Sequence, residues 1–266
     1  MATLVRRVYP ALVVLVALLA AGCQRSPAAG PPAPPGSRPR TALTGSLTVF
    51  AAASLTEAFE DDKTRLVASN AGLALTYSFA GSQQLVAQVA AGAPADVVAT
   101  ADHQAMDRLV AGGLVEVPVD FAANRLQIAV EPGNPKRVTS LADLGRADVR
   151  TVLADTSVPA GRYARQALDS AGVSVRPVSL DLDVKAVLLR VSSGEADAGV
   201  VYVTDVAAAG PTVAAVDIPP EHNVVATYPV AVVRTTRNRA GAEAFVAQLL
   251  DGPGRDALLA HGFRAT

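Results

Sequence analysis

The alternation of short β-branched runs with amphipathic stretches is the feature that most narrows the folds open to this chain. It starts with a strand-like run at residues 47–50. Residues 54–70 follow, with Leu55, Phe59 and Leu66 able to share one helical face. Half of the residues are hydrophobic, only 4% are aromatic and none is Trp, so Ala, Val and Leu must build the core. Repeated strand–helix units predict an α/β protein with a mostly parallel sheet.

The expected elements continue to the C-terminal region. The expected strands are 47–50, 73–79, 96–100, 126–130, 149–154, 199–203 and 228–233. The expected helices are 54–70, 82–91, 103–111, 161–171, 184–193 and 240–250. The folded part starts near Ser46 and spans about 220 residues, which suits either one sheet or two lobes. Periodicity alone does not choose between them.

An export signal precedes this pattern. Arg6 and Arg7 stand before an apolar run at residues 11–21, which is about half of the roughly 20 residues that a membrane-spanning helix needs. We therefore predict a signal peptide at residues 1–22. The run ends in LAAGC at 19–23, which resembles a bacterial lipobox and implies cleavage before Cys23 and acylation of that residue. The alternative is an ordinary signal peptide with an incidental cysteine.

The segment after Cys23 is predicted to be a spacer. Residues 24–40 hold six prolines and two glycines among small and basic residues, a composition that cannot bury a core. Residues 23–45 are therefore expected to be a lipidated cysteine followed by a proline-rich linker. Because Cys23 is the only cysteine, the folded part has no disulfide and no cysteine-based metal site.

The balance of charge excludes one class of partner. The chain carries 23 basic and 24 acidic residues, a net charge of −1. Five of the basic residues lie in the first forty positions, which hold no acid, so residues 41–266 carry 18 positive and 24 negative charges. We expect no nucleic-acid partner for such an acidic folded part.

Four residues stand where a strand or loop hands over to an expected helix. They are Ser54, Ser82, Ala160 and Val184. Helix starts present unpaired N–H groups and the positive end of the helix dipole, so they favour anions. Pro159 suits a first helical turn and leaves the next N–H groups free. The alternative interpretation is that each residue belongs only to a helix cap.

Longer motifs add to these junctions. They are VFAAASLT at 49–56, SFAGS at 78–82, AGAPAD at 91–96, Ala101-Asp102, VPAG at 158–161, GVVY at 199–202 and YPVAV at 228–232. Together and in this order they resemble the motifs of periplasmic molybdate-binding proteins. The resemblance runs from Ser46 to Phe263, nearly the whole folded part.

This resemblance implies a type II periplasmic-binding-protein fold, two α/β lobes joined by two hinge crossings. Lobe one would take residues 46–125 and 228–266 and lobe two residues 126–227, with crossings near 124–127 and 227–230. The ligand, molybdate or tungstate, would be held in the interlobe cleft by the hydroxyls and backbone of Ser54 and Ser82, the N–H groups of Ala160 and Val184, and the Tyr202 phenol. No residue would bind a metal cation directly.

The family also implies the setting of the protein. It would be a monomeric, extracytoplasmic lipoprotein, anchored to the cell membrane through Cys23. It would carry no cofactor and would deliver a small oxoanion to the permease and ATPase subunits of an ABC transporter. An enzyme is not expected, because His103, His222 and His261 are far apart and Ser54 lacks the G-x-S-x-G elbow of a hydrolase.

Two other ligands suit the same fold. An iron(III) receptor would need a cluster of tyrosine and acidic residues, and an organic-anion receptor would need an arginine placed for a carboxylate. Arg162 is the candidate for that arginine, and the alternative is an exposed side chain in the first turn of a helix. Asp102 with His103 is too small a set for a metal site. Asp96 is expected to be structural.

Overall fold

Strands and helices alternate along residues 43–266, the part of the chain that the computed structural model describes. The strands are β1 Gly45–Ala52, β2 Leu73–Ala80, β3 Val97–Ala99, β4 Val119–Val130, β5 Thr151–Ala154, β6 Ser179–Asp181, β7 Ala198–Tyr202, β8 Ala214–Asp217 and β9 Val225–Val232. The predicted signal peptide and the Cys23 lipidation site lie outside the described residues. None of the described helices has the length and apolar character to cross a membrane.

Helices occupy all six positions that the sequence pattern indicates, and α6 and α8 are additional. The α-helices are α1 Thr56–Ser69, α2 Ser82–Ala90, α3 His103–Ala111, α4 Pro159–Ser170, α5 Val184–Ser192, α6 Val203–Ala209, α7 Arg239–Leu250 and α8 Pro253–Ala260. Three 3₁₀ turns join them: η1 Ala53–Leu55, η2 Leu141–Gly145 and η3 Gly210–Thr212.

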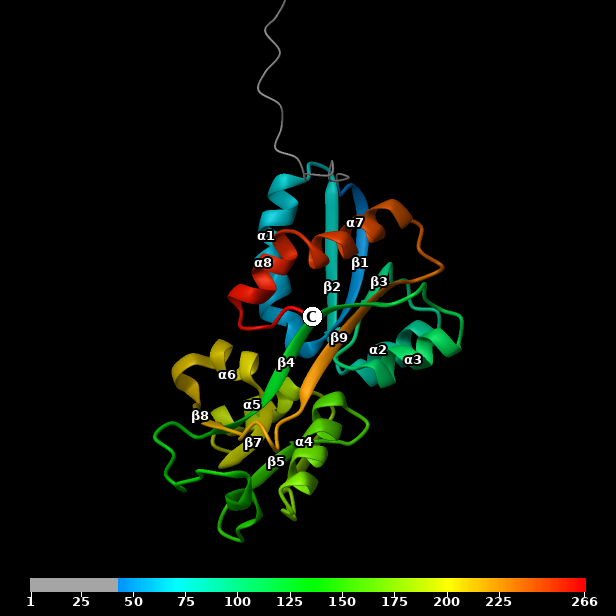
Figure 1. Cartoon of the computed structure of the whole chain (residues 1–266). Coiled ribbons are helices and arrows are strands. Elements are labelled where there is room, and N and C mark those ends of the chain that lie inside the picture. The colour runs from blue at the N-terminus through cyan, green and yellow to red at the C-terminus, as the bar shows by residue number, and fades with distance from the viewer. Residues whose placement is uncertain (1–42) are drawn as a thin grey trace, which may run out of the picture. The chain divides into compact units, whose positions relative to one another are not determined.

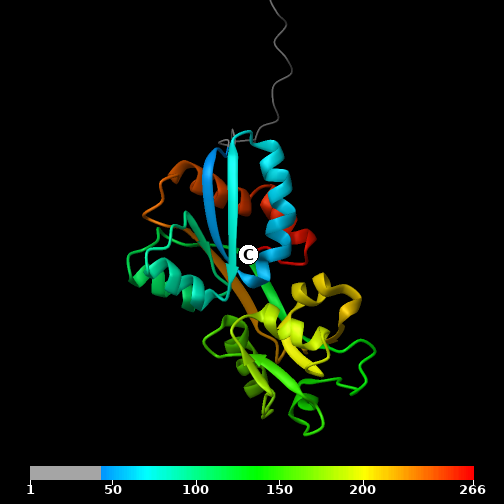
Figure 2. The ribbon, with the colours of Figure 1, turned by 180° about the vertical axis from the view of Figure 1, so that it is seen from behind.

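The strands form two α/β lobes that share β4 and β9 (Figures 1 and 2). Their order is β2-β1-β3-β9-β4-β7-β5-β6, with β8 paired to β4 beside this path. Lobe one holds β1 to β3, α1 to α3, α7 and α8, while lobe two holds β5 to β8 and α4 to α6. Along β4 the partner strand changes from β9, which pairs up to Arg125, to β7, which pairs from Leu126. β4 and β9 are therefore the two connections between lobes.

The sheet is mixed, whereas the sequence predicted a mostly parallel one. β1 pairs in parallel with β2 and β3, and β5 does so with β6 and β7, as strand–helix units require. β4 and β9 pair antiparallel with their neighbours. The reason is that β4 leaves lobe one and β9 returns to it, so the two run in opposite directions. β9 already pairs with β4 at Val225, before the predicted crossing at 227–230.

The core of lobe one has two layers, one on each face of its sheet. Alternate residues of a strand point to opposite faces. Val49 packs with Phe59 and Phe245 under the helices α1 and α7, whereas its neighbour Phe50 packs with Met106 under α2 and α3. Because both faces are covered, the strands carry near-continuous apolar runs, and their carboxyl ends are the part left open towards lobe two.

Candidate functional site

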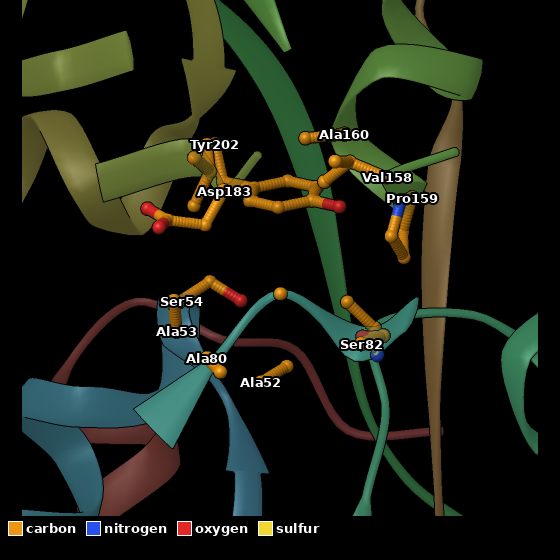
Figure 3. Close-up of a pocket in the computed structure, with 13 residues that line it drawn as sticks. Ala52, Ala53, Ser54, Ala80, Ser82, Val158, Pro159, Ala160, Asp183 and Tyr202 are labelled. Carbon is orange, nitrogen blue, oxygen red and sulfur yellow. Dashed lines mark hydrogen bonds between the residues drawn. The ribbon is translucent and has the colours of Figure 1, made fainter. Parts of the chain in front are cut away.

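A pocket lies between the lobes, where the carboxyl ends of the lobe one strands meet the starts of helices (Figure 3). The cavity volume open to a water-sized sphere is about 10 Å³. Sites for drug-sized organic molecules usually measure about 300–1,000 Å³, so this pocket is far too small for one. The lining residues are Ala52, Ala53, Ser54, Ala80, Gly81, Ser82, Ala101, Val158, Pro159, Ala160, Asp183, Val184 and Tyr202. All five residues that the sequence singled out for the ligand are in this set.

Three α-helices begin at the pocket. Ser82, Val184 and Pro159 are the first residues of α2, α5 and α4, so Pro159 lies in a first helical turn, as predicted. The first N–H groups of a helix have no intrahelical acceptor, and proline has no N–H, so Ala160 carries the first donor of α4. Ser82, Ala160 and Val184 are all buried. The pocket therefore collects unpaired donors and the positive ends of three helix dipoles.

Gly161 allows the start of α4 to sit against the preceding turn. A Cβ atom at Gly161 would lie 2.1 Å from the carbonyl oxygen of Asp155, closer than real Cβ contacts. Any side chain there would push the turn and the helix start apart. The VPAG motif thus combines a proline that opens the helix with a glycine that permits its close packing.

Ser54 does not cap a helix. It lies in the 3₁₀ turn η1, and α1 begins after it at Thr56 without any side-chain cap. Its hydroxyl instead lies 2.9 Å from the phenol oxygen of Tyr228 on β9, and both groups are buried. The cap interpretation of Ser54 is therefore wrong, because the chain enters α1 through a 3₁₀ turn that directs the side chain into the pocket (Figure 3).

Ser82 is oriented by a backbone group of the same lobe. Its hydroxyl oxygen accepts a hydrogen bond from the Ala101 N–H at 3.0 Å, while the cap position of α2 is occupied by Gly81. A serine hydroxyl has one hydrogen to donate. Since its oxygen already accepts from Ala101, that hydrogen remains available for a ligand in the pocket.

Tyr202 contributes a buried hydroxyl that has no hydrogen-bond partner within residues 43–266. Its side chain is 1% exposed and its ring lies over the pocket (Figure 3). Burial raises the pKa of the Tyr202 phenol, so the group keeps its proton and can only gain by donating it. An unpaired buried hydroxyl costs about 1–3 kcal/mol, which a ligand oxygen would recover.

The inner surface of the pocket is neutral. Among the lining residues only Asp183 is charged. Its Oδ1 accepts a hydrogen bond from the Ala186 N–H at 2.8 Å and caps α5. Figure 3 shows the carboxylate turned away from the Ser54 hydroxyl. What faces a ligand is a set of hydroxyl and backbone donors without a cation.

Arg162 is neither an exposed side chain nor free to bind a carboxylate ligand. Its Nε donates to Asp102 Oδ2 at 3.1 Å, and its Nη1 donates to the carbonyls of Thr156 and Ser157 at 3.0 and 2.7 Å. Nη2 also donates to Asp102 Oδ2. Asp102 is itself a helix cap, because its Oδ1 accepts from the Ala105 N–H at 2.9 Å. Both alternatives for Arg162 are therefore wrong.

Sequence reasoning missed two features of the site. Tyr228 belongs to a recognised motif, but nothing in the sequence indicates that it reaches Ser54 across 174 positions. The pairing of Asp102 with Arg162 spans 60 positions and was equally hidden. Neither feature leaves a local signal, because the first depends on how lobe one folds and the second on how the lobes meet.

A donor-lined pocket between two α/β lobes that share two crossing strands is the arrangement of a solute-binding protein. The chain belongs to the family of bacterial extracellular solute-binding proteins, whose model matches residues 47–264. This confirms the fold class that the motifs predicted.

Three relatives illustrate the similarity. The molybdate-binding protein ModA of Mycobacterium tuberculosis (strain ATCC 25618 / H37Rv) is 40% identical over 251 residues, covering 94% of each chain. ModA of Escherichia coli (strain K12) is 33% identical over 223 residues, covering 79% of this chain and 84% of the relative. The solved structure of the Azotobacter vinelandii periplasmic molybdate-binding protein has a TM-score of 0.73 at 20% identity, covering 83% of this chain and 99% of that one. At this identity the structural likeness shows the fold alone.

Proposed function

We propose that this protein captures molybdate, and also tungstate, in the interlobe pocket and delivers it to an ABC transporter. The observation that carries the proposal is the convergence of Ser54, Ser82, Ala160, Val184 and Tyr202 on one neutral, donor-lined pocket. The 40% identity to a molybdate-binding protein over 94% of both chains supports the choice of ligand.

Each donor would have one role. The hydroxyls of Ser54 and Ser82 would donate from lobe one, together with their backbone N–H groups. The N–H groups of Ala160 and Val184 and the Tyr202 phenol would donate from lobe two. The metal would be held only as its oxoanion, through oxygen atoms, with no side chain bound to molybdenum itself.

Neutral donors suffice to bind a dianion. A hydrogen bond to a charged partner contributes about 1.5–3 kcal/mol, so five to seven would contribute about 8–20 kcal/mol before the cost of ordering. A dissociation constant between micromolar and nanomolar, about −8 to −12 kcal/mol, follows from this balance. The acidic charge of the folded part does not prevent it, because the only lining carboxylate is engaged in capping α5.

The same lining selects among oxoanions. Hydrogen phosphate keeps a proton that needs an acceptor. In a pocket lined by donors, that O–H group meets only other hydrogens and finds no acceptor. Molybdate and tungstate are fully ionised near neutral pH and carry no such proton. Sulfate carries none either but has shorter bonds to oxygen, so only the size of the pocket discriminates against it.

The two alternative ligands find less support among the described residues. An organic anion would need a free arginine at the pocket, whereas the N–H groups of Arg162 donate hydrogen bonds to Asp102 and to two carbonyl groups. Iron(III) would need a cluster of tyrosine and acidic ligands, and Asp183, the one acidic side chain among the pocket-lining residues, is engaged in capping α5.

The proposal includes how the protein works in its setting. Signal cleavage at residues 1–22 and acylation of Cys23 would anchor it outside the cell membrane, with the proline-rich linker as spacer. Lobe one, 46–125 and 228–266, and lobe two, 126–227, would close on the anion as a monomer. The closed form would then dock on the permease, whose ATPase drives transport.

Calorimetric titration of the purified protein with molybdate, tungstate, sulfate and phosphate tests the proposal. We expect molybdate and tungstate to bind most tightly and phosphate to give no heat of binding at matched concentration. Phosphate binding as tight as molybdate, or no binding of either metal oxoanion, would overturn the assignment.

A further inference from the structure

Two ion pairs cross between the lobes beside the pocket. Arg162 of lobe two donates from Nε to Asp102 of lobe one, 3.1 Å away, and the side chains are 18% and 5% exposed. Lys185 of lobe two lies 2.7 Å from Glu57 of lobe one. In each pair lobe two supplies the cation and lobe one supplies the carboxylate.

The two cations occupy unusual positions. Arg162 lies in the first turn of α4, and Lys185 is the second residue of α5. A positive side chain near a helix N-terminus opposes the helix dipole, which favours anions there. These are the same two helices whose first N–H groups, on Ala160 and Val184, face the pocket. A purely local preference would not place cations there.

Partners across the cleft compensate for this placement. Lys185 also contacts the buried Asp205 of its own lobe at 3.0 Å, so it spans from lobe two to Glu57. Asp102 is buried next to Ala101, which lines the pocket, so an unpaired carboxylate there would repel an anion. Arg162 neutralises Asp102 only while the lobes touch.

Contacts without charge accompany the ion pairs. The Gln83 side-chain N–H donates to the carbonyl of Leu182 at 2.8 Å, again from lobe one to lobe two. A Cβ atom at Gly81 would lie 2.4 Å from that same carbonyl oxygen, so the two backbones approach closely. The cleft is therefore bridged at several points around an otherwise neutral pocket.

We propose that Asp102–Arg162 and Glu57–Lys185 are ionic clasps that set how often the empty protein is closed. Arg162 and Lys185 act as positioning residues, because they hold the starts of α4 and α5 against the hydroxyls of lobe one. The proposal rests on the proposed function for the identity of the ligand, whereas the clasps themselves act without it.

The clasps affect the apparent affinity because they change the fraction of the empty protein that is closed. A ligand that binds only the closed form has an apparent dissociation constant equal to the intrinsic one divided by the closed fraction. Removing both lobe one carboxylates should lower that fraction and weaken molybdate binding about tenfold. The pocket donors themselves remain unchanged in such a variant.

The experiment measures closure directly on the full chain, with Cys23→Ala so that the label attaches only to the two introduced cysteines. Spin labels at Val110→Cys on α3 and Gln166→Cys on α4, both exposed, report the distance between lobes by double electron–electron resonance. The variants are Asp102→Asn, Glu57→Gln and the two combined, which leave lobe two intact. Asparagine retains the ability to cap α3. Asp107→Asn and Glu60→Gln are the control pair. They remove one negative charge each from α3 and α1, at residues whose side chains form no ion pair across the cleft within residues 43–266.

We expect longer interlobe distances in the combined variant without ligand, unchanged distances in the control pair, and recovery of the short distance at about tenfold more molybdate than the parent needs. Unchanged distances in the ligand-free combined variant would overturn the clasps. Tighter molybdate binding by Asp102→Asn, with the interlobe distance unchanged, would also overturn the clasps. It would mean that Arg162 affects the anion only through its charge. Failure of the parent to bind molybdate would refute the proposed function and leave the ligand-free comparison decisive.

Discussion

The Ser54 hydroxyl and the Tyr228 phenol lie 2.9 Å apart, and they join a turn of lobe one to a strand that crosses between lobes. Burial raises the pKa of Tyr228, so the phenol keeps its proton. Either hydroxyl can be the donor of this bond, and when Tyr228 donates to Ser54 the serine hydrogen is directed to the pocket. The pair thus orients a donor that would otherwise rotate freely.

Ser54→Ala should weaken molybdate binding by about 1.5–3 kcal/mol, because it removes a hydroxyl donor from a charged ligand. Calorimetric titration measures the loss. Thr56→Ala is the control, since the Thr56 hydroxyl bonds to the Ala53 carbonyl at 2.7 Å and does not line the pocket. Equal losses in both variants would mean that the turn, rather than the hydroxyl, matters for binding.

Tyr228→Phe should weaken binding by about 1 kcal/mol while Ser54 is still present, because the serine hydroxyl loses its orienting partner. The same change in the Ser54→Ala background should have a smaller effect on affinity, which a double-mutant cycle measures. Tyr77→Phe removes a buried hydroxyl that does not line the pocket and should leave affinity unchanged. Additive losses of affinity in the cycle would mean that Tyr228 does not act through Ser54.

Molybdate and tungstate should raise the unfolding temperature of the protein, because a ligand that binds only the native state stabilises it. At about a thousandfold excess over the dissociation constant the gain is about 4 kcal/mol. Differential scanning calorimetry with each oxoanion measures it. A shift of the same size with phosphate would contradict the selectivity argued from the donor-only lining.

Stability should depend on Asp143 in acid. Hydrogen bonds to its carboxylate, first from the backbone N–H of Thr139, lower its pKa from 3.8 to about 2. The folded pKa lies below the unfolded one, so this contribution is present above pH 3.8 and is lost as the pH falls towards 2. Asp143→Asn should therefore lower the urea midpoint at pH 7, with a gap to the parent that narrows below pH 3.8. A gap independent of pH would assign the loss to packing.

Membrane attachment should depend on Cys23. Cys23→Ala should release the protein from the membrane fraction, because a thiol is needed to carry the acyl chain. Mass spectrometry of the parent should find acyl mass on Cys23. A parent that is recovered in soluble form without this mass would point to an ordinary signal peptide.

Helices with a polar cap could be located from the sequence to within a residue. The structure places α3 at His103–Ala111 after the cap Asp102, and α5 starts at Val184 after the cap Asp183, both as predicted. The helix α6 was missed, because it begins directly after the strand residue Tyr202 with no side-chain cap. Residue 203, expected to end a strand, is its first residue.

The hydrophobic pattern of the sequence also failed to predict several short elements and elements at the edge of the sheet. β6 is three residues long and its central Leu180 is exposed, so it lacks the alternation of a half-buried strand. The helix α8 begins at Pro253, directly after Gly252, and a Gly-Pro pair is typical of a turn. The first half of β4 was missed because Asp120 and Asn124 interrupt its apolar run, although it pairs with β9.

The site was more accessible to sequence reasoning than the cleft around it. Ser54, Ser82, Ala160, Val184 and Tyr202 lie in local motifs at strand ends, and the sheet brings those ends together in one pocket. The contacts between lobes involve residues such as Arg162 and Asp102, whose pairing is fixed by the relative position of two folded bodies. No spacing along the chain records that position.

The two strands that connect the lobes are also hydrogen-bonded neighbours, from Val119 opposite Val230 to Arg125 opposite Val225. Two separate tethers would let one lobe swivel over the other, whereas a paired ribbon resists twisting and bends mainly about a line across its width. The lobes would then separate by a hinge rotation about a single axis. We expect the mouth of the cleft to open towards one fixed side, so that the anion would enter and leave by one route.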